Sequence, residues 1–154
     1  MKLFIDLKST TNVYQQVKFK YMKHTEEQLP LVYSCSGCSS SAQMANYLAV
    51  QLDRQGVAEM SCIAGVGGNV KKLVKTATSG RKIIVIDGCP LACSKHCLEN
   101  HAVNADIYFD LSLMGVSKKL HEDFCHLQAK ALFIQLKQVI DPSFKKSRLN
   151  SIPL

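Results

Sequence analysis

Short apolar runs alternate with longer segments of helical periodicity through most of this chain. Apolar and β-branched runs predict strands at 31–34, 57–63 and 82–87, and a partly alternating segment predicts a fourth at 105–111. Apolar residues at helical spacing predict helices at about 40–55, 69–78, 90–102 and 121–140. Strands that alternate with helices in this way form parallel β-α-β units. The pattern therefore predicts a three-layer α/β domain, Rossmann-like or flavodoxin-like, with about four parallel strands and helices on both faces.

Local residues indicate where the predicted helices begin and end. Serines at 39–41 are N-cap candidates for the first helix, and Gly56 is its C-terminal stop. Pro90 stands at the first-turn position of the third helix, where proline is favoured. The glycine-rich segment 64–68 fits neither the GxGxxG nor the GxxxxGK(S/T) pattern, so we favour a tight turn, or a loop that leaves room for a neighbour, over a phosphate-binding loop. In the last helix the expected buried residues are Leu127, Ala131, Ile134 and Leu136.

The same patterns divide the chain into one core domain and two flanking segments. Residues 1–28 are polar and lack a clean period, so we expect an extension outside the core. A chain that begins at Met22 should therefore still fold. Residues 29–141 form the predicted domain, and residues 142–154 carry three positive charges and read as a basic tail.

Composition and charge narrow the class of protein. Hydrophobic residues make up 47% of the chain and charged residues 20%, which is typical of a globular protein. No run reaches the roughly 18 apolar residues of a membrane helix, and the start lacks a signal peptide, so we expect a cytoplasmic protein without a membrane partner. The net charge is +7, but residues 30–141 carry eleven Lys and Arg against nine acids. That balance argues against nucleic-acid binding and names no protein partner.

Cysteines are the unusual feature of the composition. Seven of them in a chain expected in a reducing compartment favour metal binding or thiol chemistry over a disulfide framework. Free cysteines also serve as small core residues, and we assign that role to Cys125 in the last predicted helix. The remaining six are candidates for a site: Cys35, Cys38, Cys62, Cys89, Cys93 and Cys97.

The predicted strands bring these cysteines together. Cys35 and Cys38 follow the first strand, Cys62 lies near the end of the second, and Cys89 follows the third. Ligands of parallel sheets bind beyond the carboxyl ends of the strands. We therefore expect a cysteine-rich site at that edge, and zinc is the ion that a set of thiolates favours.

The spacing of the cysteines limits which ones share an ion. A regular helix from Cys89 to Cys97 would rise about 12 Å, whereas two thiolates on one zinc lie at most about 4.6 Å apart. We therefore favour Cys35, Cys38, Cys89 and Cys93, and keep Cys62 and Cys97 as reserve ligands or as ligands of a second ion. The predicted metal ligands are thus Cys35, Cys38, Cys89, Cys93, Cys62 and Cys97. His101 could join Cys97, although an exposed position is the commoner outcome for such a histidine.

Two other kinds of thiol chemistry remain open. Thiols between a strand and a helix can become reactive, so the cysteines could carry persulfide sulfur or exchange disulfides. They could also hold an iron–sulfur cluster, although the Cys-x3-Cys-x3-Cys spacing matches neither common ferredoxin run. No arginine follows Cys35 before Arg54, which argues against a phosphatase, and no G-x-S-x-G elbow is present. The residues therefore name no reaction.

Three ordered motifs resemble those of the DGC-domain family. They are LVYSCSGCSS at 31–40, CIAGVGG at 62–68 and DGCPLACSKHC at 87–97. The family comprises small zinc-binding proteins named for the Asp-Gly-Cys motif, and the resemblance covers about residues 29–140. It implies zinc bound through cysteines and supplies no reaction.

Overall fold

The computed structural model describes residues 28–141. The predicted extension and basic tail fall almost entirely on residues 1–27 and 142–154, outside the described part, so those boundaries stay predictions. Among the helices described, none combines the length and apolar content that a membrane span requires. The elements in chain order are β1 (Leu31–Ser34), α2 (Ser40–Arg54), β2 (Glu59–Met60), α3 (Ile63–Gly67), α4 (Lys71–Ala77), β3 (Ile83–Asp87), α5 (Cys93–Glu99), β4 (Ile107–Asp110), the 3₁₀-helix η1 (Leu111–Met114) and α6 (His126–Ile140).

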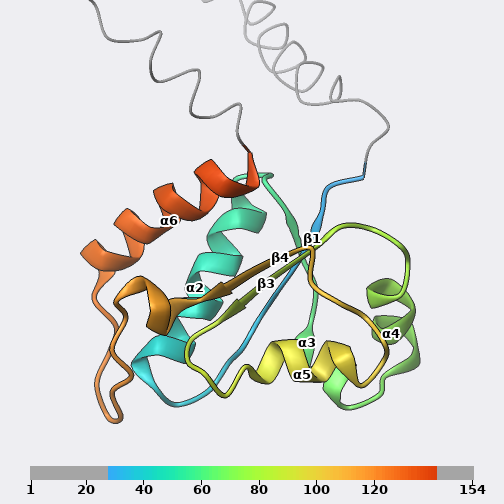
Figure 1. The fold of residues 1–154 in the computed structure, drawn as a ribbon, viewed down its shortest axis with the longest axis horizontal. Coiled ribbons are helices and arrows are strands. Elements are labelled where there is room, and N and C mark those ends of the chain that lie inside the picture. Colours follow the sequence, from blue (N-terminus) through green and yellow to red (C-terminus); the bar gives the residue numbers. More distant parts are fainter. Residues whose placement is uncertain (1–27, 142–154) are drawn as a thin grey trace, which may run out of the picture.

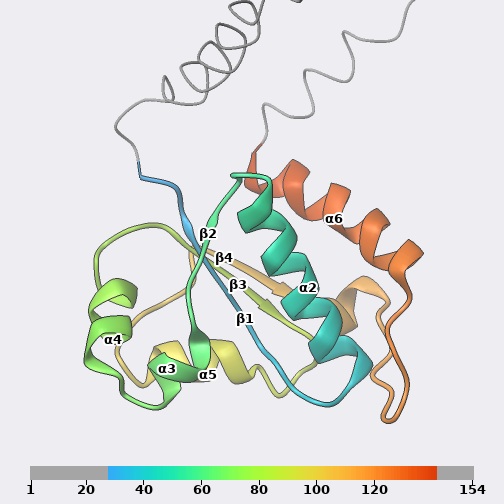
Figure 2. The same cartoon turned by 180° about the vertical axis from the view of Figure 1, so that it is seen from behind.

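The four strands form one parallel sheet in the order β2-β1-β3-β4. Helices α2 and α6 cover one face, and α3, α4 and α5 lie on the other (Figure 1). The view from behind shows the same division (Figure 2). The predicted three-layer α/β fold is therefore confirmed.

Strand alternation supplies the two halves of the core. In β1, Val32 points to the side of α2 and α6, whereas Leu31 and Tyr33 point to the side of α3, α4 and α5. All four residues of β1 and all five of β3 are buried, as expected of central strands covered on both faces. The sheet is thus a rigid base from which the loops at its carboxyl edge project.

Helix α2 begins and ends as the sequence predicts. The Ser39 hydroxyl accepts a hydrogen bond from the Ala42 N–H and caps the helix. Gly56 follows with a φ of +64°, the left-handed conformation that ends helices. The apolar stripe of α2 is buried against the sheet and α6. It includes Ala45, Leu48, Ala49 and Leu52.

The glycine-rich segment forms a helix and not the predicted tight turn or loop, but its glycines leave room for neighbours as predicted. Residues 63–67 are α3, and the glycines are needed for close packing. A methyl group on Gly65 would lie 1.9 Å from Leu73 Cδ1 of α4, and one on Gly67 would lie 2.9 Å from Cys97 Sγ of α5. These two glycines let the neighbouring helices approach α3.

The last helix also differs from the prediction. It begins at His126 and not near 121. In the segment before it, Phe124 packs against the rings of Tyr47 of α2 and His126. Its buried residues are Ala129, Leu132 and Leu136, so the buried side was predicted wrongly in part. Leu127 is 78% exposed.

Candidate functional site

The cysteines gather at the carboxyl edge of the sheet. Cys35 directly follows β1, and Cys62 and Cys89 each come two residues after the last residue of β2 and β3. Because the strands are parallel, these positions share one edge, as the sequence predicts. Cys38 precedes α2, which begins at this edge.

Asp87, the first residue of the Asp-Gly-Cys motif, holds the start of α5. Its side chain is fully buried, and its two oxygens accept hydrogen bonds from the N–H groups of Ser94 at 2.9 Å and Lys95 at 3.2 Å. These N–H groups have no partner within the helix, so the carboxylate replaces the missing carbonyls. Asp87 is therefore a positioning residue, and its carboxylate is engaged by backbone.

Gly88 is required by close contact with α2. A methyl group at Gly88 would lie 2.5 Å from the Ser41 carbonyl oxygen and 2.8 Å from the Ala42 nitrogen. The Gly88 N–H also donates a hydrogen bond to the Cys35 sulfur at 3.1 Å. One residue thus joins the end of β3, the start of α2 and the thiol that follows β1.

Cys89 lies in the turn before the helix, as the predicted helix start near Pro90 implies. The N–H of Ala92 donates to the Cys89 carbonyl oxygen at 3.1 Å, and Ala92 has a φ of 48°. Helix α5 then begins at Cys93, three residues later than Pro90 suggested. The helix-rise limit therefore applies only from Cys93 to Cys97, and Cys89 is free of it.

Two thiols near the Asp-Gly-Cys turn have a raised pKa. Cys35 is 7% exposed, and burial raises the pKa of its thiol to about 12, with smaller contributions from the nearby charges of Asp87, Cys93 and Cys89. Burial, followed by Cys93 and Asp87, also raises the pKa of Cys97. The charge of Cys93 thus contributes to the raised pKa of both Cys35 and Cys97.

The remaining predicted ligands lie further out on the same edge. Cys38 and Cys62 are exposed, and Cys62 directly precedes α3. Burial raises the pKa of the Tyr33 phenol, and the charge of Cys62 is a small further contribution. His101 is not directed at a thiol, because its Nε2 lies 3.0 Å from the Val66 carbonyl oxygen. Cys125 is exposed just before α6, and not a core residue as the sequence suggested.

The donor chemistry suits zinc, but the side chains do not converge on one point. Thiolates are the ligands that structural zinc sites favour. Among residues 28–141, however, no three His, Cys, Asp or Glu side chains lie close enough together to hold a metal ion. The predicted ligand set therefore stays a prediction.

A polar neighbour of the Cys89 thiol comes from a segment that the predicted site did not include. The Lys118 ammonium donates a hydrogen bond to the Cys89 sulfur at 3.7 Å. Lys95 of α5 lies over the ring of Tyr108 of β4, with Nζ 5.4 Å from its centroid. Lys118 belongs to the segment after β4, so the carboxyl-edge rule applied to all four strands would have found it.

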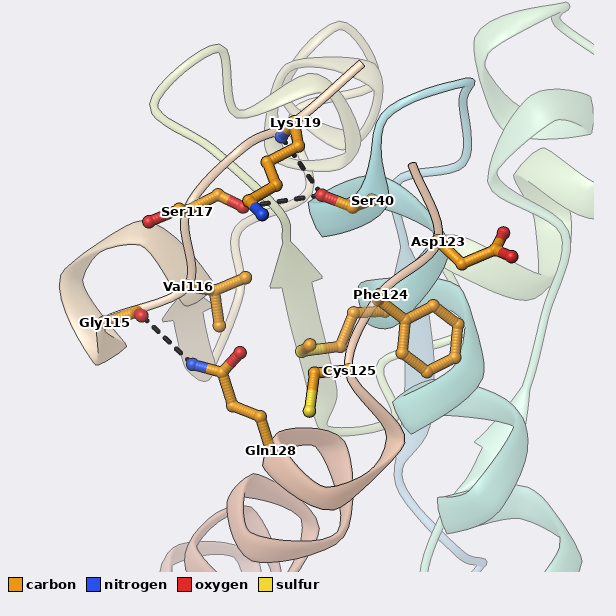
Figure 3. A pocket seen from close by; sticks show the side chains of 10 residues that line it. Ser40, Gly115, Val116, Ser117, Lys119, Asp123, Phe124, Cys125 and Gln128 are labelled. Atoms are coloured by element: carbon orange, nitrogen blue, oxygen red, sulfur yellow. Dashed lines mark hydrogen bonds between the residues drawn. The ribbon is translucent and has the colours of Figure 1, made fainter. Parts of the chain in front are cut away.

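Lys118 reaches Cys89 because residues 115–125, the η1–α6 loop, are fastened to the start of α2. The Ser40 N–H donates to the Lys119 carbonyl oxygen at 2.9 Å, and the Lys119 N–H donates to the Ser40 hydroxyl at 3.0 Å. The same hydroxyl donates to the Ser117 carbonyl oxygen at 3.4 Å (Figure 3). The loop also lines a cavity of about 250 Å³ together with α2 and the first turn of α6, into which Cys125 and Gln128 project (Figure 3).

Comparisons with known proteins agree with the motif resemblance. Residues 31–136 match the DGC domain family. The chain is also 48% identical over 126 residues to the anaerobic and virulence modulator AnvM of Pseudomonas aeruginosa. The aligned region covers 82% of this chain and 96% of that protein. No solved structure matches the chain.

Proposed function

Because this chain belongs to the DGC domain family, we propose that it is a zinc-binding protein whose thiolates hold the ion at the carboxyl edge of the sheet. The favoured ligands are Cys35, Cys38, Cys89 and Cys93. Cys62 and Cys97 are further candidates on the same edge. When bound, the ion supplies positive charge to thiolates and, with an open position, Lewis acidity.

The observation that carries the proposal is that Cys35, Cys62 and Cys89 follow three parallel strands at one edge of the sheet. Thiols without a function have no reason to follow three separate strand ends at a single edge. Asp87 and Gly88 fix this geometry through the start of α5 and the packing against α2. The Asp-Gly-Cys motif would then serve to present Cys89 and Cys93 to Cys35.

Zinc also resolves the chemical problem of the buried thiol. Burial raises the pKa of Cys35 to about 12, so on its own this thiol stays protonated. A bound dication stabilises the thiolate and releases the proton, so zinc uptake should release protons and strengthen as the pH rises.

The name of the Pseudomonas aeruginosa relative suggests a biological role. That protein is named an anaerobic and virulence modulator, and by extension this chain is proposed to modulate anaerobic functions. Only reduced cysteines bind zinc as thiolates, so metal occupancy depends on redox conditions. Anaerobic growth of a strain that lacks the gene can be measured after complementation with the wild-type chain or with Cys93→Ser. The wild-type chain should restore growth and Cys93→Ser should not. Full recovery with Cys93→Ser would contradict a role that needs the thiol.

Metal analysis tests the proposal. The full-length chain, purified without oxygen, is expected to hold about one zinc and no visible colour, and Cys35→Ser and Cys89→Ser should lose the metal. Cys125→Ser, which removes an exposed thiol before α6, is the matched control and should keep it. Wild-type chain without zinc would contradict the zinc proposal. Unchanged zinc in Cys35→Ser or Cys89→Ser would contradict the ligand set.

Thiol chemistry is the second candidate, favoured by the Lys118 ammonium 3.7 Å from the Cys89 sulfur. A cation at that distance complements the charge of a nucleophilic thiolate, as sulfur transfer or disulfide exchange requires. Metal-free chain whose Cys89 is alkylated rapidly would favour this function. Iron with sulfide and a brown colour would instead favour an iron–sulfur cluster.

A further inference from the structure

We propose that the thiol site recognises a small anion, a carboxylate or a thiolate, which binds beside Cys89 against Lys118. This inference rests on the proposed function only in taking Cys89 as a thiol of the site. Lys118 belongs to the η1–α6 loop, and Lys95 and Tyr108, which contact each other, belong to α5 and β4.

Lys118 is the principal recognition group. Its ammonium lies 3.7 Å from the Cys89 sulfur. The loop that carries it is fastened to Ser40 by three hydrogen bonds in all, one at Ser117 and two at Lys119. In the described part of the chain, no carboxylate forms an ion pair with Lys118, whereas the neighbouring Lys119 is paired with Glu122 at 2.8 Å. One lysine of the loop thus keeps its charge available at the thiol.

Tyr108 lies beside Lys95. The residue is 38% exposed and stands two residues before the end of β4. Burial, with smaller contributions from the charges of Asp87, Asp110, Cys35 and Cys89, raises the pKa of its phenol to about 12, so the hydroxyl keeps its proton. The Lys95 ammonium lies over the ring.

The acids of the site are engaged elsewhere. Both Asp87 oxygens accept backbone N–H groups of α5, and an Asp110 oxygen accepts from the Ser112 N–H and hydroxyl. Glu99 lies 3.8 Å from Lys95 and also contacts His96, so it offsets part of the Lys95 charge. Lys118 is therefore the cation on which anion recognition depends most.

Paired alkylating reagents test the inference. Iodoacetate carries a carboxylate and iodoacetamide does not, so the ratio of their rate constants at Cys89, read by mass spectrometry of the full-length chain, reports the local charge. A unit positive charge a few ångströms from the incoming carboxylate should raise this ratio about five-fold, and salt should lower it. Lys118→Met should lose the preference and Lys118→Arg should keep it.

Lys75→Met is the matched control, because it removes the same charge from the last turn of α4, near the amino end of β3. It should keep the wild-type ratio. A ratio that is unchanged in Lys118→Met, or lowered equally by Lys75→Met, would overturn the inference.

A second measurement separates this inference from the proposed function. The ratio is read before and after incubation with a chelator, so that bound metal does not mask the thiol. Zinc is measured in the same samples. Absence of zinc with an intact ratio would contradict only the zinc proposal, and zinc with no iodoacetate preference would contradict only anion recognition.

Discussion

Gly88→Ala tests how the Asp-Gly-Cys motif is built into the fold. The added methyl group would lie 2.5 Å from the Ser41 carbonyl oxygen, 2.6 Å from the Ser41 carbonyl carbon and 2.8 Å from the Ala42 nitrogen. All three are backbone atoms at the start of α2, so no side chain can turn away. The end of β3 and the start of α2 must instead separate by roughly 1 Å before the methyl group reaches ordinary contact distance.

That displacement should destabilise the fold by about 1–3 kcal/mol, as other overpacked cores are destabilised. The lower backbone entropy of unfolded alanine recovers only about 0.4–1 kcal/mol of this. Urea unfolding should show a lower midpoint with an unchanged slope. The shift should also disturb the Gly88 N–H bond to Cys35 and so weaken zinc binding.

Gly37→Ala is the matched control for this prediction. A methyl group there would lie 3.7 Å from the Ala42 Cβ, which is an ordinary contact, so stability should change by less than about 0.5 kcal/mol. If Gly88→Ala unfolds at the wild-type midpoint, the close approach of β3 and α2 is not a property of the folded protein, and the packing argument for Gly88 is wrong.

Three further predictions follow from the core and the site. Asp87→Ala leaves two backbone N–H groups of α5 without an acceptor and should cost about 1–3 kcal/mol in urea unfolding; wild-type stability would contradict the cap. Leu136→Ala should cost about 2–5 kcal/mol because the side chain is fully buried, whereas Leu127→Ala, at 78% exposed, should change stability by less than about 0.5 kcal/mol; equal effects would contradict the assigned face of α6. Burial raises the pKa of Cys35 from 9.0 to about 12, so the unfolded chain loses this proton first. The metal-free chain should therefore lose stability as the pH rises from about 9 to 12, and Cys35→Ser should remove that part of the loss, measured as urea midpoints across this range.

The sheet and its edge were predictable from the sequence because strand signals are local. The apolar runs ending at Ser34 and Asp87 mark two central strands, and parallel connections place whatever follows them at one edge. The position of the cysteines therefore needed no knowledge of side-chain packing. The same rule applied to the fourth strand would have brought Lys118 into the site.

The details that failed depend on contacts between distant residues. Pro90 looked like a helix start, but α5 begins at Cys93 because the Asp87 carboxylate caps it from the end of β3. The glycines of α3 resemble a turn in the sequence, whereas their function is to accommodate Leu73 and Cys97. Neither contact has a signature within a short window of residues.

Zinc K-edge X-ray absorption of the full-length chain, purified without oxygen, tests the central claim most directly. Four thiolates on one ion would give a single sulfur shell at about 2.3 Å, whereas nitrogen or oxygen ligands lie at about 2.0–2.2 Å. The account predicts stoichiometric zinc with the sulfur shell. A chain without zinc, or zinc surrounded mainly by nitrogen and oxygen, would contradict it.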